Sequence, residues 1–107
     1  MEIQGDKHNF TLCTIKSINH KALRQLWETG KSPKLPLDRV NRIMQILEVI
    51  DSAQKVPQDF EFFRNWEIHP LKGEWKSYWS LTVKENWRII FRYVGQDAFD
   101  LDYLDYH

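Results

Sequence analysis

The sequence predicts an α+β domain with two N-terminal helices packed on one face of a mainly antiparallel β-sheet. In the first half, apolar residues recur at intervals of three and four, whereas from Glu67 onward they alternate by two. Short turns separate the alternating stretches, as in a meander of antiparallel strands. With 107 residues, of which 42% are hydrophobic and 28% charged, the chain has the composition of one globular core.

The first helix is expected to follow Asn19, a residue type that caps helix N-termini. Leu23, Leu26 and Trp27 then fall at helical spacing, and Gly30 is placed to end the helix. This spacing predicts a short helix with one buried face.

A second, amphipathic helix is expected over residues 38–53, with Asp38 as its cap. Residues 31–36 precede it and contain two prolines, which interrupt helical hydrogen bonding and predict a connector. The apolar face of this helix consists of Val40, Ile43, Met44, Leu47 and Ile50. The two helices form a hairpin that must cover an apolar surface.

Three strands are expected to provide that surface, with two shorter ones possible over 15–18 and 66–69. The inward-facing residues of the three strands are predicted to be Trp79, Leu81 and Val83, then Trp87, Ile89, Phe91 and Tyr93, then Phe99, Leu101 and Tyr103. A hairpin turn at residues 95–97 joins the last two strands.

The opposite sheet face is expected to carry Arg88 and Arg92 next to Asp100 and Asp102, which predicts cross-strand ion pairs. Among the five tryptophans, core packing is the default role, and Trp75 is the one expected to be exposed because charged residues flank it.

The net charge of zero hides an uneven distribution. Residues 1–57 hold nine Lys and Arg against six Asp and Glu, whereas residues 97–107 hold four aspartates and no Lys or Arg. Any nucleic-acid site must therefore be local. No stretch has the length of a membrane span or the pattern of a secretory signal, so we expect a cytoplasmic protein without membrane association. Cys13 is the only cysteine and is expected to be inert.

Two histidines have neighbours that suggest chemistry: His69, which opens the segment 69–73, and the terminal His107. If they converge with Lys72 and Arg88, the set can move protons and stabilise a pentavalent phosphate without a metal or cofactor. That chemistry is RNA cleavage by internal attack of a 2′-hydroxyl. The alternative is a surface histidine and a frayed terminus without function.

Four ordered blocks carry a family resemblance: residues 69–73, 78–80, 86–89 and 105–107. Together with the opening residues 15–18 and the helix 20–30, they make residues 15–107 resemble the HigB toxins of the RelE/ParE superfamily. Residues 1–14 have no matching motif and are treated as an N-terminal extension of unknown role.

The resemblance implies two helices on a curved antiparallel sheet and an mRNA interferase that cuts message in the ribosomal A site. Carried over by position, the two histidines transfer protons, the aspartate orients or acts as base, the lysine and arginine hold the scissile phosphate, and the tyrosine positions the substrate. Which residue is base and which is acid stays open. The matching positions are His69, Lys72, Arg88, Asp105, Tyr106 and His107.

The resemblance also implies partners: a HigA-type helix-turn-helix antitoxin, the 30S A site with its mRNA, and operator DNA through the antitoxin alone. Basic residues of the helices and their connector either contact ribosomal RNA or form a solvated face: Lys21, Arg24, Lys31, Lys34, Arg39 and Arg42. Two alternatives share the fold: a ParE-like toxin that binds a topoisomerase, and a degenerate toxin that only binds an antitoxin or DNA.

Overall fold

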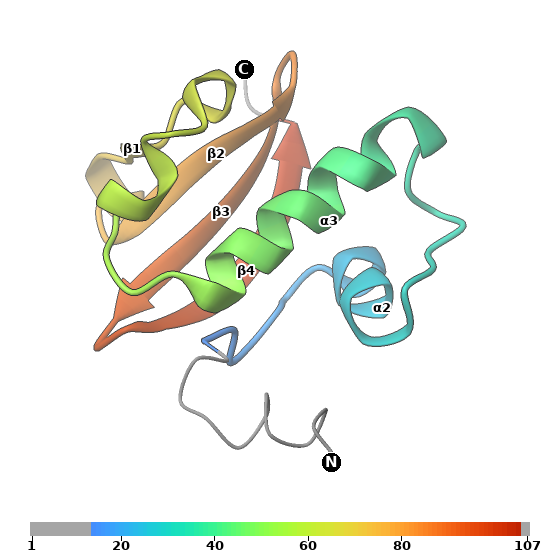
Figure 1. Cartoon of the computed structure of the whole chain (residues 1–107), viewed down its shortest axis with the longest axis horizontal. Helices are drawn as coiled ribbons and strands as arrows, with labels where there is room; N and C mark the ends of the chain where they lie inside the picture. The colour runs from blue at the N-terminus through green and yellow to red at the C-terminus, as the bar shows by residue number, and fades with distance from the viewer. Residues whose placement is uncertain (1–13, 106–107) are drawn as a thin grey trace.

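The computed structural model describes residues 14–105 and confirms the α+β class. Predictions for residues 1–13, Tyr106 and His107 lie outside the described residues. In Figure 1, α3 crosses one face of a four-stranded antiparallel sheet of order β1-β2-β3-β4, and α2 lies beside α3. The elements are α2 (Lys21–Thr29), α3 (Leu37–Ser52), β1 (His69–Pro70), β2 (Tyr78–Lys84), β3 (Trp87–Val94) and β4 (Asp97–Asp105), with the 3₁₀ helices η1 (Gln58–Phe60), η2 (Arg64–Trp66) and η3 (Gly73–Trp75).

Helix α2 begins one residue later than predicted, because His20 and not Asn19 is its N-cap. The imidazole Nδ1 of His20 accepts a hydrogen bond of 3.2 Å from the Leu23 amide and so satisfies one free donor of the first turn. The helix ends at Gly30 as predicted, where φ is 82°.

Helix α3 begins at Leu37, and the prediction that Asp38 caps it was wrong. Pro36 occupies the cap position without a side-chain hydrogen bond. Asp38 lies in the first turn, where its negative charge favours the helix N-terminus, and it accepts a 2.6 Å hydrogen bond from Lys84 of β2.

The core lies between the helices and the sheet, and both helices supply it with buried side chains from their predicted inward faces. Nine leucine and isoleucine side chains of the described residues are fully buried in it: Leu23, Leu26, Ile43, Ile46, Leu47, Ile50, Leu81, Ile89 and Leu101. Burial of this apolar surface holds α2 and α3 against the sheet.

Both short strands differ from prediction. Trp66 lies in η2, is only 3% exposed and stacks on Phe63 with ring centroids 4.0 Å apart. The strand β1 therefore contains His69 and Pro70 alone. Residues 14–18, named the strap here, form no strand but make isolated parallel bridges to β4 through Ile15 and Ile18.

A register shift in β4 corrects the prediction that Phe99 faces inward. Asp100 adopts φ 56°, and between Arg92 and Ile90 of β3 the strand β4 gains an extra residue. Ala98 and Leu101 therefore face the core, whereas Phe99 pairs with Arg92 on the opposite face, where the guanidinium lies over its ring.

Candidate functional site

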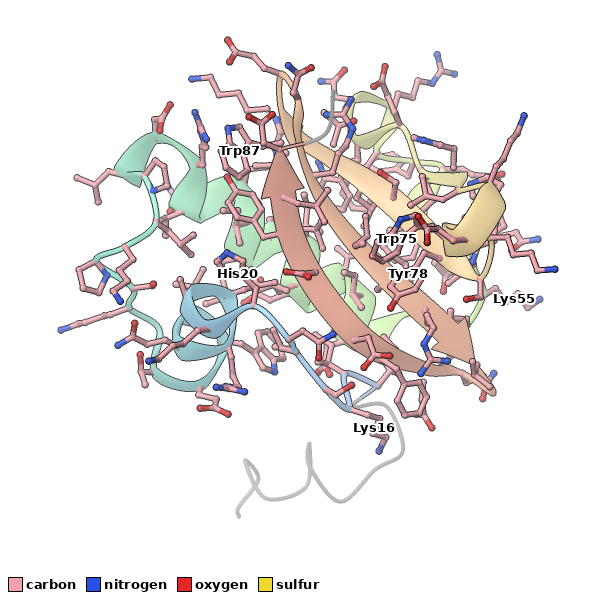
Figure 2. The ribbon with its side chains drawn as sticks, turned by 180° about the vertical axis from the view of Figure 1, so that it is seen from behind. Lys16, His20, Lys55, Trp75, Tyr78 and Trp87 are labelled. Carbon is pink, nitrogen blue, oxygen red and sulfur yellow. The ribbon has the colours of Figure 1, made fainter. Side chains whose placement is uncertain are left out.

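The sheet face opposite α3, named the open face here, carries the first residues of the candidate site. Figure 2 views the molecule from this side. Strand register places His69, Ser80, Ile90 and Asp102 in one row across the four strands, because directly paired residues point to the same face. Arg88 lies on the same face, because it pairs with Thr82, two residues beyond Ser80 in β2.

The His69 ring is oriented by backbone. Its Nδ1 lies 2.8 Å from the carbonyl oxygen of Glu67, two residues earlier. A carbonyl oxygen can only accept, so this hydrogen bond requires the proton on Nδ1 and leaves Nε2 as the acceptor of the neutral ring. The exposed His69 therefore has an Nε2 that can accept a hydrogen bond or a proton.

Glu67 is the residue that sequence reasoning missed. It adopts φ 50°, which turns its carbonyl oxygen toward His69, and its carboxylate accepts a 3.2 Å hydrogen bond from Thr82 of β2. A left-handed non-glycine residue has no clear signal in the sequence. The only hint was its position two residues before a candidate histidine.

Lys72 and Arg88 provide two cations. Lys72 is exposed and is the N-cap residue of η3, three residues beyond His69. Arg88 is half-buried, and its Nη1 donates to the backbone carbonyls of Glu85 and Trp87, which fixes the guanidinium beside the β2–β3 turn. By standard sheet spacing, the Cα atoms of His69 and Arg88 lie about 12 Å apart.

The predicted ion pairs of the open face form in part. Arg92 Nε donates to Asp100 at 2.9 Å, as predicted. Arg88 instead donates to the turn carbonyls described above, and Asp102 accepts from the Tyr103 amide. Backbone carbonyls are therefore hydrogen-bond partners of the Arg88 guanidinium.

Asp105 is exposed at the end of β4, the opposite edge of the sheet from His69. Three strand spacings, about 14 Å, separate these edges. Asp105 pairs with Trp87, so register assigns it to the helix side of the sheet. The structure thus brings His69 and Arg88 to the open face, places Lys72 three residues beyond His69 at the start of η3, and leaves Asp105 at the opposite edge. Tyr106 and His107, the other two candidates, lie outside the described residues.

A polar and aromatic cluster adjoins the end of β4. The Trp87 ring stacks on Tyr103 with centroids 4.8 Å apart, and the Arg39 guanidinium lies over Trp87. The hydrogen bond from Arg39 to the Tyr103 hydroxyl, 3.4 Å long, raises the pKa of Arg39 further above its ordinary value. This cluster secures the strand end from which the C-terminal residues continue.

The basic residues of the helices divide into two groups. The side chains of Arg39 and Arg42 have internal partners, Tyr103 and the carbonyl of Val83. The other four are exposed on α2 and the connector: Lys21, Arg24, Lys31 and Lys34.

Comparison with known proteins decides the family. Residues 16–107 match the model of the HigB-like toxins, described as RelE-like toxins of the type II toxin–antitoxin system HigB. The chain belongs to the HigB-like toxin family. It is 44% identical over 94 residues to "Endoribonuclease HigB" of Proteus vulgaris, covering 87% of this chain and 99% of that protein. It is 32% identical over 88 residues to "Toxin HigB-1" of Vibrio cholerae serotype O1, covering 81% and 90%.

Membership of the HigB family confirms the resemblance noted from the sequence and implies an antitoxin partner. Among residues 14–105, no helix has both the length and the apolar character to cross a membrane. Within the same described residues, no group of three or more His, Cys, Asp or Glu side chains could hold a metal ion.

Proposed function

We propose that this HigB-family toxin is an endoribonuclease that cuts mRNA in the ribosomal A site, with His69 as the general base. The observation that carries the proposal is the His69 ring, whose Nδ1 is held by the Glu67 carbonyl on the same sheet face as Arg88. The relative named as an endoribonuclease, 44% identical to this chain, supports the reaction class.

In the proposed reaction, Nε2 of His69 takes the proton of a ribose 2′-hydroxyl while that oxygen attacks the adjacent phosphorus. The bond from phosphorus to the 5′-oxygen breaks, and a general acid donates a proton to the leaving oxygen. The products are a 2′,3′-cyclic phosphate and a 5′-hydroxyl. Lys72 and Arg88 neutralise charge on the non-bridging oxygens.

The C-terminal residues complete the proposed mechanism. His107 is the candidate general acid, Asp105 orients it, and Tyr106 positions the substrate. The general base and the general acid act on the same phosphate, so the proposal requires the C-terminal residues to meet the substrate beside His69, although Asp105 ends β4 at the opposite sheet edge.

The neutral chain explains why the ribosome is needed in this proposal. With a net charge of zero, the toxin gains little from bulk attraction to free RNA, so the ribosome must supply orientation. The exposed cations of α2 and the connector are proposed to contact ribosomal RNA. The proposed antitoxin is of the HigA helix-turn-helix type and carries the operator DNA contact, and the toxin acts in the cytoplasm.

The test is a reconstituted translation system in which new mRNA 5′ ends are mapped after toxin is added. His69→Asn keeps a donor for the Glu67 carbonyl but has no basic nitrogen, so it is expected to lower cleavage about 100-fold or more. Deletion of His107 is expected to have a similar effect.

His20→Asn is the matched control, because asparagine can still cap α2 and the residue lies outside the proposed site. It is expected to cleave like wild type. Wild-type cleavage by His69→Asn would remove His69 from the mechanism. Growth arrest without any cleavage would favour inhibition of a topoisomerase instead.

A further inference from the structure

Trp75 is a large aromatic residue exposed on the sheet face that carries His69. Its side chain is 43% exposed, although tryptophan usually packs inside. Figure 2 shows Trp75 and Tyr78 together in front of the sheet, and their rings meet edge to face with centroids 5.0 Å apart. The open face thus presents an aromatic surface that the proposed mechanism does not use.

This aromatic surface is held in place by its own loop. The Leu71 amide donates to the Tyr78 carbonyl at 2.9 Å, which closes the loop at its base. The Trp75 amide donates to the Lys72 carbonyl at 3.3 Å within η3, and Gly73 adopts φ 69° at the start of that turn. The ring is therefore positioned before any ligand arrives.

Its neighbours are the proposed phosphate-binding and base residues. Tyr78 lies two positions before Ser80, the direct partner of His69, so both face the same side. Lys72 caps the turn that ends at Trp75. Exposed aromatic rings beside cations are the usual means of binding single-stranded RNA, because every base offers a π-face.

We propose that Trp75, supported edge-on by Tyr78, is the platform on which one nucleobase next to the scissile phosphate stacks. This inference rests on the proposed endoribonuclease function and names a substrate subsite for it. The competing role is purely structural, since Ser80 and Ile90 are buried on this face, only 1% and 2% exposed. If Trp75 stacks on a base, the effect of its substitution on cleavage depends on the presence of that base, whereas a structural role gives no such dependence.

The experiment measures cleavage of ribosome-bound mRNA that carries a single abasic ribonucleotide at each position flanking the cut in turn. In wild type, one of these positions is expected to lower cleavage about ten-fold or more, the scale for loss of one stacked base. Trp75→Leu is expected to lower cleavage of intact mRNA by a similar factor. The variant is then expected to cleave mRNA with that abasic position as well as it cleaves intact mRNA, because the stacking contact is already absent. Trp75→Phe, which keeps a ring, is expected to retain most of the activity.

Phe62→Leu is the matched control, because Phe62 is 87% exposed and lies between η1 and η2, outside the open face. It is expected to leave cleavage and its abasic profile unchanged. The stacking role is refuted if, at every abasic position, the fold-loss of cleavage caused by Trp75→Leu multiplies with the fold-loss caused by the missing base. This criterion holds even where the variant is less stable than wild type. Absence of cleavage by wild type would refute the proposed function, and this inference with it.

Discussion

Asp51 provides a sharp test of how the strap is attached. This carboxylate is 8% exposed near the C-terminal end of α3, where a negative charge is unfavourable to the helix. One of its oxygens accepts hydrogen bonds from the Thr14 amide at 3.0 Å and the Ile15 amide at 3.1 Å. The contacts join the start of the strap to the helix layer.

The expected cost of Asp51→Ala follows from those two bonds. A hydrogen bond to a charged group contributes about 1.5–3 kcal/mol. The Thr14 amide also donates to the Asp51 backbone carbonyl at 3.0 Å, so this amide keeps a partner when the carboxylate is removed. We expect a loss of about 2–4 kcal/mol in the free energy of unfolding, a large share of the 5–15 kcal/mol typical of a domain.

Urea denaturation of wild type and variants measures this loss, and hydrogen exchange of the Thr14 and Ile15 amides locates it. Asp51→Asn keeps a neutral acceptor and is expected to lose about half as much. Ser52→Ala, at the exposed neighbouring position, is expected to stay within about 0.5 kcal/mol of wild type. The reasoning fails if Asp51→Ala is as stable as the Ser52 variant.

Three further predictions concern single side chains. Burial, with the charges of Asp59 and Asp97, raises the pKa of Tyr93. The free energy of unfolding is therefore expected to fall as pH rises above about 10. Denaturation curves of Tyr93→Phe should lack this part of the pH dependence. The hydrogen bond from Lys84 lowers the pKa of Asp38, so the advantage of wild type over Lys84→Met should be present at neutral pH and disappear as pH falls below about 4. Arg88→Ala is expected to lower cleavage about 10- to 100-fold, and Arg88→Lys is expected to lower it less. Thermal stability is measured for both variants, because Arg88 also binds the β2–β3 turn. Equal losses of cleavage in the two variants would argue against a charge contact with phosphate.

The elements that local periodicity controls were predictable from the sequence. The helix expected over 38–53 runs from Leu37 to Ser52, and the expected strand over 87–93 runs from Trp87 to Val94. Alternation by two also placed Arg88 on the face opposite the core. These features depend on residues close in the chain, so their pattern is visible without the fold.

Features that depend on distant contacts were not predictable. The inward position of Phe99 failed because Asp100 takes a left-handed conformation, held by Ser17 and Arg92. Similarly, the expected strand over 66–69 failed because Trp66 packs on Phe63 in a 3₁₀ turn. The extra residue in β4 reverses the faces of the residues before it relative to those after it, so Ala98 takes the inward place expected for Phe99 while Leu101 and Tyr103 stay inward.

The candidate site shows the same division. Alternation placed Arg88 on the face opposite the core, and the exposure of Trp75 was also predicted from its charged neighbours. That His69 shares the face of Arg88 follows from the strand register, because the sequence indicated their convergence only as a condition. The Glu67 carbonyl that sets the His69 tautomer depends on a left-handed turn that composition does not indicate. The roles of all six candidate residues stay predictions: His69, Lys72, Arg88, Asp105, Tyr106 and His107.

The proposed toxin cuts mRNA by attack of the 2′-hydroxyl, with the ribosome supplying orientation. The most direct test determines the chemistry of the cut ends, with purified toxin added to message either on ribosomes or free. We expect cuts within A-site codons that need ribosomes and leave a 2′,3′-cyclic phosphate and a 5′-hydroxyl. Cuts that leave 5′-phosphate ends, or an intact message in the presence of ribosomes, would contradict it.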